Sequence, residues 1–272
     1  MLSLTNPIYD RINKAIEYFE SNEKISITEC AKKFNIHRST LSKYLKEYDL
    51  YKDKRKYKVD ENFFEKIDTE EKAYWLGFLT ADGCIKKNRY QISLGLSIKD
   101  INHLEKYKKS LKSEKNIKIE ENYSFNNKSV MCYLRIDNKK MYTDLLNLGF
   151  SSKKTMNEQP VELSEDLINH YIRGIFDGDG WISIYGRHAE VGFGMGLKIL
   201  QYIREKSEQY AKIKRYKINP YKTIFRYKFQ SKREILKFLN WIYKDATIYL
   251  DRKYEKYLQF CRFELNTTEN SK

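Results

Sequence analysis

The sequence predicts an α+β fold in which a small all-α domain precedes a core built from two copies of one unit. A glycine-rich segment that ends on Asp-Gly occurs twice, at residues 75–83 and 172–180, and predicts the duplication. Segments of alternating polarity follow both copies, whereas the first fifty residues show only helical periodicity. We therefore expect an N-terminal domain at 1–50, a linker at 51–61, and core repeats at 62–158 and 159–272.

The charge of the chain predicts a polyanionic partner. Lys and Arg total 52 against 37 Asp and Glu, which gives a net charge of +15. Nucleic acid suits this balance better than a membrane surface, because no basic amphipathic anchor stands out. A lysine-rich proteome that comes from an AT-rich genome stays open as the alternative explanation of the charge.

Cysteine usage and apolar runs exclude several protein classes. The four Cys and four His are dispersed without the spacing of a disulfide framework or a zinc site. No apolar run reaches the length of a membrane span, and the N-terminus lacks a signal-peptide pattern. We expect a cytoplasmic protein that does not bind membranes.

Three helices are predicted in the N-terminal domain, over residues 7–50. Apolar residues at 27–45 recur at helix-turn-helix offsets, and Asn35 stands at the turn, where a left-handed residue is needed. The segment resembles the helix-turn-helix family, which implies a second helix from His37 to Glu47 in a major groove. The residues expected to face DNA are Arg38, Ser39, Thr40, Ser42, Lys43 and Lys46. A helical bundle that binds protein stays open.

The basic linker at 51–61, which includes Arg55, is expected to follow phosphates, although a solvated linker explains it equally well. Beyond it, Asp68 and Glu71 form a capping-box-like start for the first glycine-rich helix. Gly77 and Ala81 lie four residues apart on that helix, as Gly174 and Gly178 do on the second. Small residues at this spacing share one face, and we expect the two helices to pack closely there.

Each of these helices is expected to end at an aspartate, Asp82 or Asp179, with the next glycine as a helix stop. If the helices pack in the same direction, the two carboxylates meet at the negative ends of two helix dipoles and repel. A divalent cation between them removes this repulsion, and hard oxygen ligands favour Mg²⁺. Such a site suits phosphodiester hydrolysis by metal-activated water. The alternative is that each Asp-Gly step is only a turn.

The two segments, WLGFLTADG and IRGIFDGDG, resemble the motifs of LAGLIDADG homing endonucleases over residues 61–265. The resemblance implies two α-β-β-α-β-β-α units in a pseudo-twofold monomer, with antiparallel sheets that bind DNA. It also implies a double-strand break with short 3′ overhangs in a long asymmetric target. Asp82 and Asp179 would bind Mg²⁺, for which Mn²⁺ is expected to substitute, together with the backbone at Ala81 and Gly178. Thr80 departs from the motif's usual acid, whereas Asp177 keeps it.

Alternating strands are expected at 91–98, 129–136, 189–196 and 223–229, and helices at 101–112, 197–210 and 231–243. This pattern places Arg135, Arg226 and Lys228 on open sheet faces. The resemblance further implies that Lys154 and Lys253 act near the scissile phosphate, and that Asp100 contacts the active-site water. The second-repeat counterpart of Asp100 falls near Gly196, so the two sites are expected to differ in efficiency.

Two other functions remain open for this fold. One is a DNA-binding regulator whose core has lost catalysis, to which the Thr80 and Gly196 departures lend support. The other is a maturase that acts on intron RNA, which the predicted DNA-reading helix-turn-helix disfavours.

Overall fold

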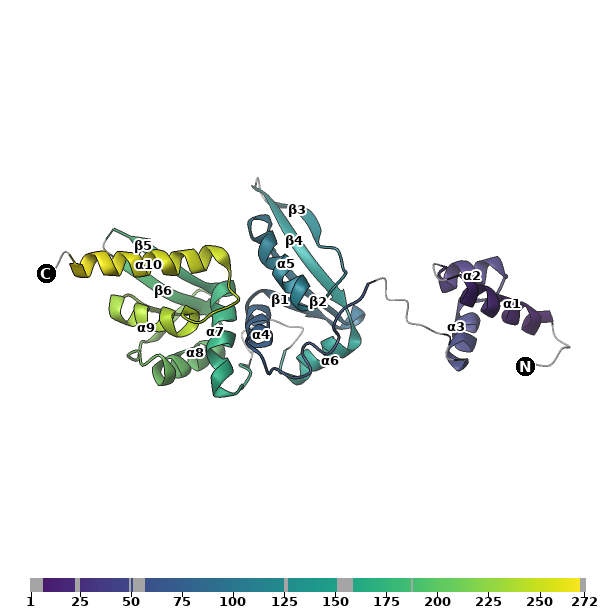
Figure 1. The fold of residues 1–272 in the computed structure, drawn as a ribbon, viewed down its shortest axis with the longest axis horizontal. Coiled ribbons are helices and arrows are strands. Elements are labelled where there is room, and N and C mark those ends of the chain that lie inside the picture. The colour runs from purple at the N-terminus through teal and green to yellow at the C-terminus, as the bar shows by residue number, and fades with distance from the viewer. Residues whose placement is uncertain are drawn as a thin grey trace. The chain divides into compact units, whose positions relative to one another are not determined.

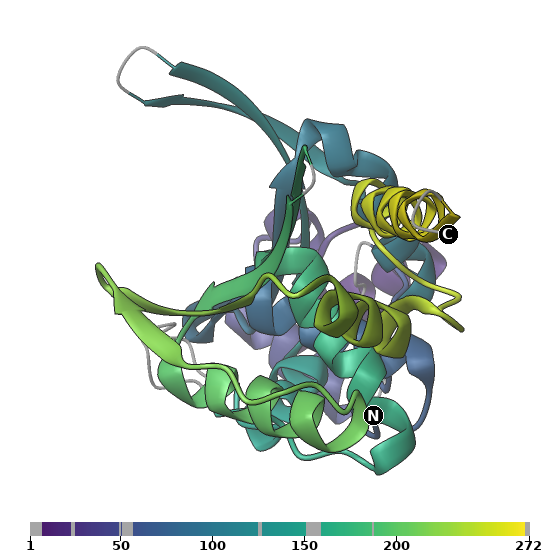
Figure 2. The same ribbon diagram turned by 90° about the vertical axis from the view of Figure 1, so that its left-hand side faces the viewer.

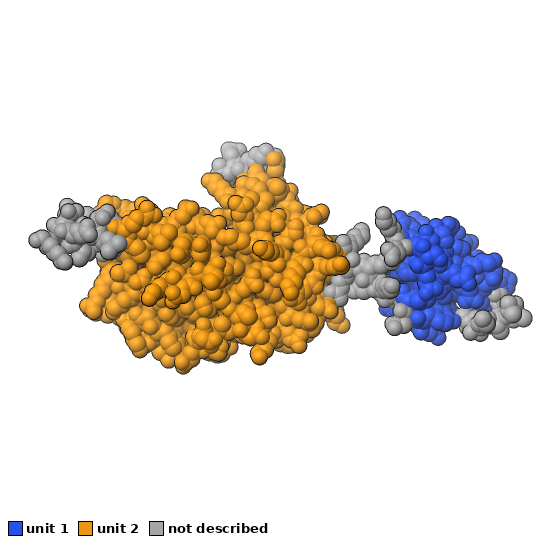
Figure 3. All heavy atoms as spheres, in the orientation of Figure 1, with its two compact units in different colours: residues 1–56 blue, residues 57–272 orange. Residues whose placement is uncertain are grey.

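The computed structural model describes residues 7–22, 25–48, 50, 57–124, 127–150, 159–186 and 188–269. The chain divides into two compact units, Met1–Lys56 and Tyr57–Lys272 (Figure 3). In the part of the chain that the structure describes, no helix has the length and apolar character needed to cross a membrane.

The first unit contains three helices, α1 (Pro7–Ser21), α2 (Ile27–Lys33) and α3 (Arg38–Glu47), as the sequence predicted. Its small core is formed by apolar residues of all three helices: Ile12, Ala15, Ile16, Phe19, Cys30, Ala31, Leu41 and Leu45. A capping box between Ser26 and Glu29 begins α2. Asn35 has the expected left-handed backbone, with φ of 51°, at the turn that leads to α3.

The second unit contains the duplicated core (Figure 1). The elements of the first repeat are α4 (Glu70–Asp82), β1 (Gly83–Lys86), β2 (Gln91–Ser97), α5 (Ile101–Ser110), β3 (Lys118–Ser124), β4 (Asn127–Asp137) and α6 (Lys139–Asn147), with 3-10 turns at Lys87–Arg89 and Ile98–Asp100. The second repeat contains α7 (Glu165–Asp179), β5 (Gly180–Tyr185), β6 (His188–Met195), α8 (Leu197–Tyr210), β7 (Ile218–Tyr221), β8 (Ile224–Phe229) and α9 (Lys232–Tyr243). This order confirms the predicted α-β-β-α-β-β-α unit. A further helix, α10 (Asp251–Glu269), was not predicted.

Each repeat forms one four-stranded antiparallel sheet, in the order β1-β2-β4-β3 or β5-β6-β8-β7. Alternation decides which face of each strand is buried: Ile92, Leu94 and Leu96 of β2 enter the core, as do Tyr227 and Phe229 of β8. The opposite faces carry polar side chains. In Figure 2 the β3–β4 and β7–β8 hairpins project to the same side of the unit, away from α10.

One local expectation about the glycine-rich helices, the start of the first, needs correction. The N-cap of α4 is Thr69, whose side chain accepts a hydrogen bond from the Lys72 amide at 3.3 Å, whereas Asp68 binds the Lys72 ammonium at 2.9 Å. Gly83 and Gly180 are the C-caps of their helices, as predicted; their φ angles are −71° and −82°, and each residue begins a strand directly. The need for glycine there is steric: a Cβ at Gly83 would lie 2.5 Å from the Leu79 carbonyl oxygen.

Candidate active site

Helices α4 and α7 cross at the centre of the second unit and touch backbone to backbone (Figure 1). A Cβ at Gly77 would lie 2.0 Å from the carbonyl oxygen of Tyr171. A Cβ at Gly174 would lie 2.0 Å from the carbonyl oxygen of Tyr74. Only glycine fits at either position, so these two residues set the close approach of the two repeats.

The same crossing brings the two motif aspartates to one end of the helix pair. Further along, a Cβ at Gly178 would lie 2.3 Å from Cβ of Ala81 and 3.1 Å from Oδ2 of Asp82. The Asp82 carboxylate therefore lies against the residue that precedes Asp179. Both aspartates are the last residues of their helices and both are exposed, at the point where β1 and β5 begin.

Lys253 is buried beside this end of α7. It lies in the first turn of α10, is 4% exposed, and its ammonium donates hydrogen bonds to the carbonyl oxygens of Phe176 at 2.5 Å and Gly180 at 2.6 Å, with a longer contact of 3.4 Å to Gly178. Burial lowers its pKa to about 8, although the charges of Asp177, Asp82 and Asp179 oppose the shift. Lys253 thus places a positive charge within electrostatic range of both motif carboxylates.

Asp100, expected near the active-site water, is engaged in an ion pair between the repeats. Its carboxylate accepts hydrogen bonds at 3.0 and 3.1 Å from Nε of Arg252, the neighbour of Lys253. A second ion pair joins Lys106 of α5 to Asp251 at 2.6 Å. Both contacts attach the start of α10 to the first repeat.

Asp177, the acid retained at the sixth motif position, is fully buried and faces away from solvent. Its carboxylate accepts hydrogen bonds from the Tyr74 hydroxyl at 2.7 Å, the Leu250 amide at 2.7 Å and the Tyr243 hydroxyl. Burial raises its pKa, while the nearby Lys253 charge and these donors favour the ionised form. In the other motif, the Thr80 hydroxyl donates to the Leu76 carbonyl oxygen at 3.0 Å.

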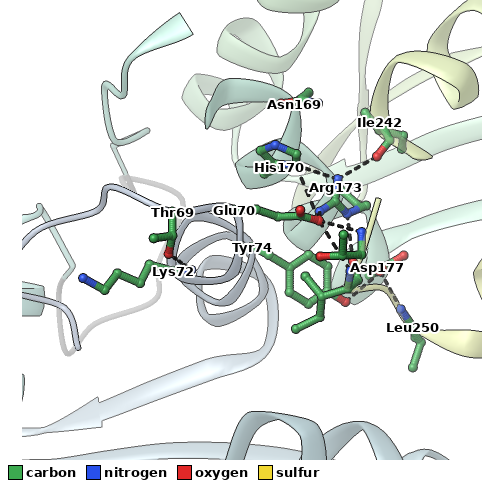
Figure 4. Close-up of polar contacts among 12 residues, drawn as sticks. Thr69, Glu70, Lys72, Tyr74, Asn169, His170, Arg173, Asp177, Ile242 and Leu250 are labelled. Carbon is green, nitrogen blue, oxygen red and sulfur yellow. Dashed lines mark hydrogen bonds and ion pairs between the residues drawn. The ribbon is translucent and has the colours of Figure 1, made fainter. Parts of the chain in front are cut away.

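A buried ion pair that sequence reasoning missed lies beside Asp177 (Figure 4). The Arg173 guanidinium is 0% exposed and binds Glu70 of α4 at 2.6 Å. It also donates to the carbonyl oxygens of Ile242 at 2.8 Å and Ile248 at 2.9 Å. The available signal was the pair of charged residues at 173 and 177 inside the otherwise apolar stretch 171–178, because charges buried in such a stretch require partners.

The predicted DNA-facing residues of the sheets lie on the faces opposite the core, where acidic or aromatic neighbours hold them. Arg135 binds Glu120 through two hydrogen bonds of 2.5 and 2.8 Å and stacks on Tyr133. Arg226 lies 3.3 Å above the centre of the Tyr221 ring, and Lys228 pairs with Glu190 at 2.7 Å. The guanidinium and ammonium groups are therefore oriented before any partner binds.

In the first unit, the six residues predicted to face DNA all lie on α3. Arg38, Ser39, Lys43 and Lys46 are exposed, whereas Thr40 and Ser42 are half-buried. Ser39 is further held by a 2.7 Å contact to Nδ1 of His37. Two predicted site residues, Arg55 of the linker and Lys154, lie outside the described residues.

The donor set at the end of α4 and α7 fits a hard divalent cation. It offers two carboxylates and the nearby carbonyl oxygens, and glycine at 178 leaves the space beside the Asp82 carboxylate that a Cβ would fill. Among the residues that the structure describes, no group of three or more His, Cys, Asp and Glu side chains is placed to hold a metal ion. Water and phosphate oxygens would have to complete the coordination.

Comparisons with known proteins concern both units. Residues 9–50 match the helix-turn-helix Psq domain family. No curated protein matches the sequence. In structure, the chain is similar to the LAGLIDADG homing endonuclease I-LtrWI bound to target DNA, with 14% identity and a TM-score of 0.49 over 72% of this chain and 91% of that one.

Two further solved structures have a similar fold. The LAGLIDADG meganuclease I-AabMI bound to uncleaved DNA gives 12% identity and a TM-score of 0.48, over 72% of this chain and 91% of that one. Full-length DUF199/WhiA from Thermatoga maritima gives 18% identity and a TM-score of 0.47, over 78% of this chain and 69% of that one. These solved structures carry the LAGLIDADG, meganuclease or WhiA name, and the Psq helix-turn-helix match covers the N-terminal residues alone.

Proposed function

We propose that the protein is a site-specific DNA endonuclease that makes a metal-dependent double-strand break. The observation that carries this proposal is the meeting of Asp82 and Asp179 at one end of the α4–α7 pair, beside the buried Lys253 charge. Two helices that end on like charges at the same place are most simply explained by a cation that binds both. The net charge of +15 supports a polyanionic substrate.

In this mechanism, Asp82 and Asp179, with backbone oxygens at Ala81 and Gly178, would hold Mg²⁺ or Mn²⁺. A bound ion of this kind acts as a Lewis acid and lowers the pKa of coordinated water. The chain's own contribution is to fix one carboxylate from each repeat on a rigid helix crossing. Lys253 would add positive charge close to the phosphate under attack, and Lys154 would do the same for the other strand.

DNA would lie along the helix-free faces of the two sheets, where Arg135, Arg226 and Lys228 are held by their neighbours. Because these side chains are already oriented by their neighbours, DNA binding would cost less side-chain entropy. Because the two repeats differ in sequence, a monomer would bind an asymmetric target and cut it to short 3′ overhangs. The α3 residues of the first unit would add a separate major-groove contact.

The test replaces each motif carboxylate by its amide. A duplex target is first selected from a pool of randomised sequences by cleavage with the wild-type chain and Mg²⁺. Asp82→Asn and Asp179→Asn should each abolish double-strand cleavage of that target and leave its binding largely unchanged. Glu105→Gln, which removes an exposed acid on α5, is the control that should cleave normally. Cleavage of the selected target at the wild-type rate by either Asp variant would contradict the proposal.

One observation favours a second function, that of a DNA-binding regulator which does not cleave. The Lys253 ammonium already donates to carbonyl oxygens of α7, so it is engaged in holding the helix end. If the wild-type chain selects a duplex by binding but cuts neither strand with Mg²⁺ or Mn²⁺, this second function is supported.

A further inference from the structure

The segment that joins α9 to α10 is held by charged side chains. The Thr247 amide donates to Oε1 of Glu70 at 2.8 Å, and the Ile248 carbonyl accepts from Nε of Arg173 at 2.9 Å. The next two residues are held in the same way: the Tyr249 carbonyl accepts from Lys106 at 3.2 Å, and the Leu250 amide donates to Asp177 at 2.7 Å. The carboxylates and cations come from α4, α5 and α7, and therefore from both repeats.

Two of these side chains, Arg173 and Asp177, are completely buried (Figure 4). A buried charge that loses a partner is strongly unfavourable, so each of these contacts restricts the segment to one position. We call Glu70, Arg173 and Asp177 the clamp residues, because they hold backbone groups of residues 247, 248 and 250.

The clamped segment leads directly to Lys253. The Leu250 carbonyl oxygen accepts a hydrogen bond from the Lys253 amide at 2.9 Å, and this bond forms part of the first turn of α10. The Lys253 side chain then returns to α7 and donates to the carbonyl oxygen of Phe176, the residue before Asp177. Asp177, Leu250 and Lys253 thus close a ring of contacts on α7, and the position of the ammonium depends on the Asp177–Leu250 hydrogen bond.

In sequence, the clamp residues have no charged counterparts at the equivalent positions of the other repeat. When the two motifs are aligned on Gly77 and Gly174, Leu76 takes the place of Arg173 and Thr80 takes the place of Asp177. Glu70 likewise corresponds to Leu167. Each ionisable clamp residue therefore has a counterpart without charge, and the first repeat cannot build the same set of charged contacts.

We infer that Glu70, Arg173 and Asp177 are positioning residues for Lys253, and that one of the two strand-cutting sites depends on this clamp while the other does not. This inference rests on the proposed endonuclease function. It predicts that a weakened clamp converts the enzyme from a double-strand cutter into one that nicks a single, defined strand.

The matched variants are Asp177→Ala and Thr80→Ala, which alter equivalent positions of the two motifs. The full chain is assayed with Mg²⁺ on the selected duplex, labelled on either strand in separate reactions. Asp177→Ala should slow cleavage of one strand by about 10- to 100-fold more than cleavage of the other, the usual effect of losing a residue that orients a catalytic group. Asp177→Asn keeps an acceptor for the Leu250 amide and should recover part of the loss. Thr80→Ala should produce no strand-selective loss.

Hydrogen exchange of the Leu250 amide tests the clamp without DNA. It should be faster in Asp177→Ala than in the wild type and unchanged in Thr80→Ala, which also shows that the variant is folded. Equal slowing of both strands by Asp177→Ala, or an unchanged Leu250 exchange rate, overturns the inference and leaves the proposed function intact. A wild-type chain that binds the duplex but cuts neither strand refutes the proposed function itself.

Discussion

Replacing Gly174 by alanine sets two physical effects against each other. Alanine is the better helix former and would stabilise an isolated helix by about 1 kcal/mol. In the folded protein, however, the new Cβ would lie 2.0 Å from the Tyr74 carbonyl oxygen and 2.7 Å from the Phe78 nitrogen. Both atoms belong to the backbone of α4, so no side-chain rotation can relieve the contact.

The size of the effect follows from that distance. Ordinary contact begins at 3.4 Å, so α4 and α7 would have to separate by about 1.4 Å, the difference between 3.4 and 2.0 Å. Overpacking of a core costs about 1–3 kcal/mol, and a contact between two backbones belongs at the upper end of that range. After subtraction of the helix-propensity gain, we expect Gly174→Ala to lower the free energy of unfolding by about 2 kcal/mol. For a unit of this size, that corresponds to a fall in Tm of about 4–8 °C.

Urea and thermal denaturation of the full chain would measure this change. Gly194→Ala is the control, because its Cβ would meet the end of the Ile224 side chain at 3.1 Å and the Trp181 ring at 3.9 Å, and no backbone atom among its nearest neighbours. It should be close to neutral. A Gly174→Ala variant that is as stable as the wild type, or more stable, would show that helix propensity dominates and that the α4–α7 crossing is not tight.

Two further predictions concern acid stability and the first unit. Burial, with the charges of Lys106 and Arg252, lowers the pKa of the His103 imidazole to about 3 in the folded protein. In the unfolded chain this imidazole has its ordinary pKa of about 6.5, so below that pH only the unfolded state binds the proton. The free energy of unfolding should therefore fall by about 1.4 kcal/mol for each pH unit below about 6.5. Urea midpoints between pH 6 and pH 4.5 should therefore fall less in His103→Gln, and equal falls in both proteins would contradict this effect. A chain that begins at Val59 keeps both motif aspartates and should still cut the selected target. It should bind more weakly, with a salt slope shallower by about 0.9 for each lost phosphate contact and a shorter footprint, whereas an unchanged footprint would argue against DNA contact by α3.

Local patterns in the sequence were enough to predict the repeated unit. Alternation placed Ile92, Leu94 and Leu96 on the buried face of one strand, because side-chain direction in a strand depends only on residue parity. The four-residue spacing of small residues likewise indicated a helix-packing face. Helix α10 escaped prediction, although it carries Lys253. Its apolar residues Tyr254, Tyr257, Leu258 and Cys261 recur at helical spacing, but the expected α-β-β-α-β-β-α unit was already complete without a further helix.

The partners of charged residues could not be read in the same way. The sequence identified Asp177 only as the retained acid of the second motif and indicated no partner for it or for Arg173. Their contacts reach Glu70 on the other repeat and Leu250 beyond α9. The ion pair of Asp100 with Arg252 was likewise not foreseen. No periodicity along the chain specifies which distant group a buried charge meets.

The sequence by itself therefore determined the α+β class, the duplication, the helix-turn-helix and the two aspartates at the ends of paired helices. These depend on residue spacing and on the steric demands of glycine, both of which are local. Only the tertiary structure decided that the Lys253 ammonium binds the end of α7 and that a charged clamp holds its position. The physical reason is that burial of a charge is tolerated only where donors and acceptors from several elements converge, and that convergence exists only once the chain has folded.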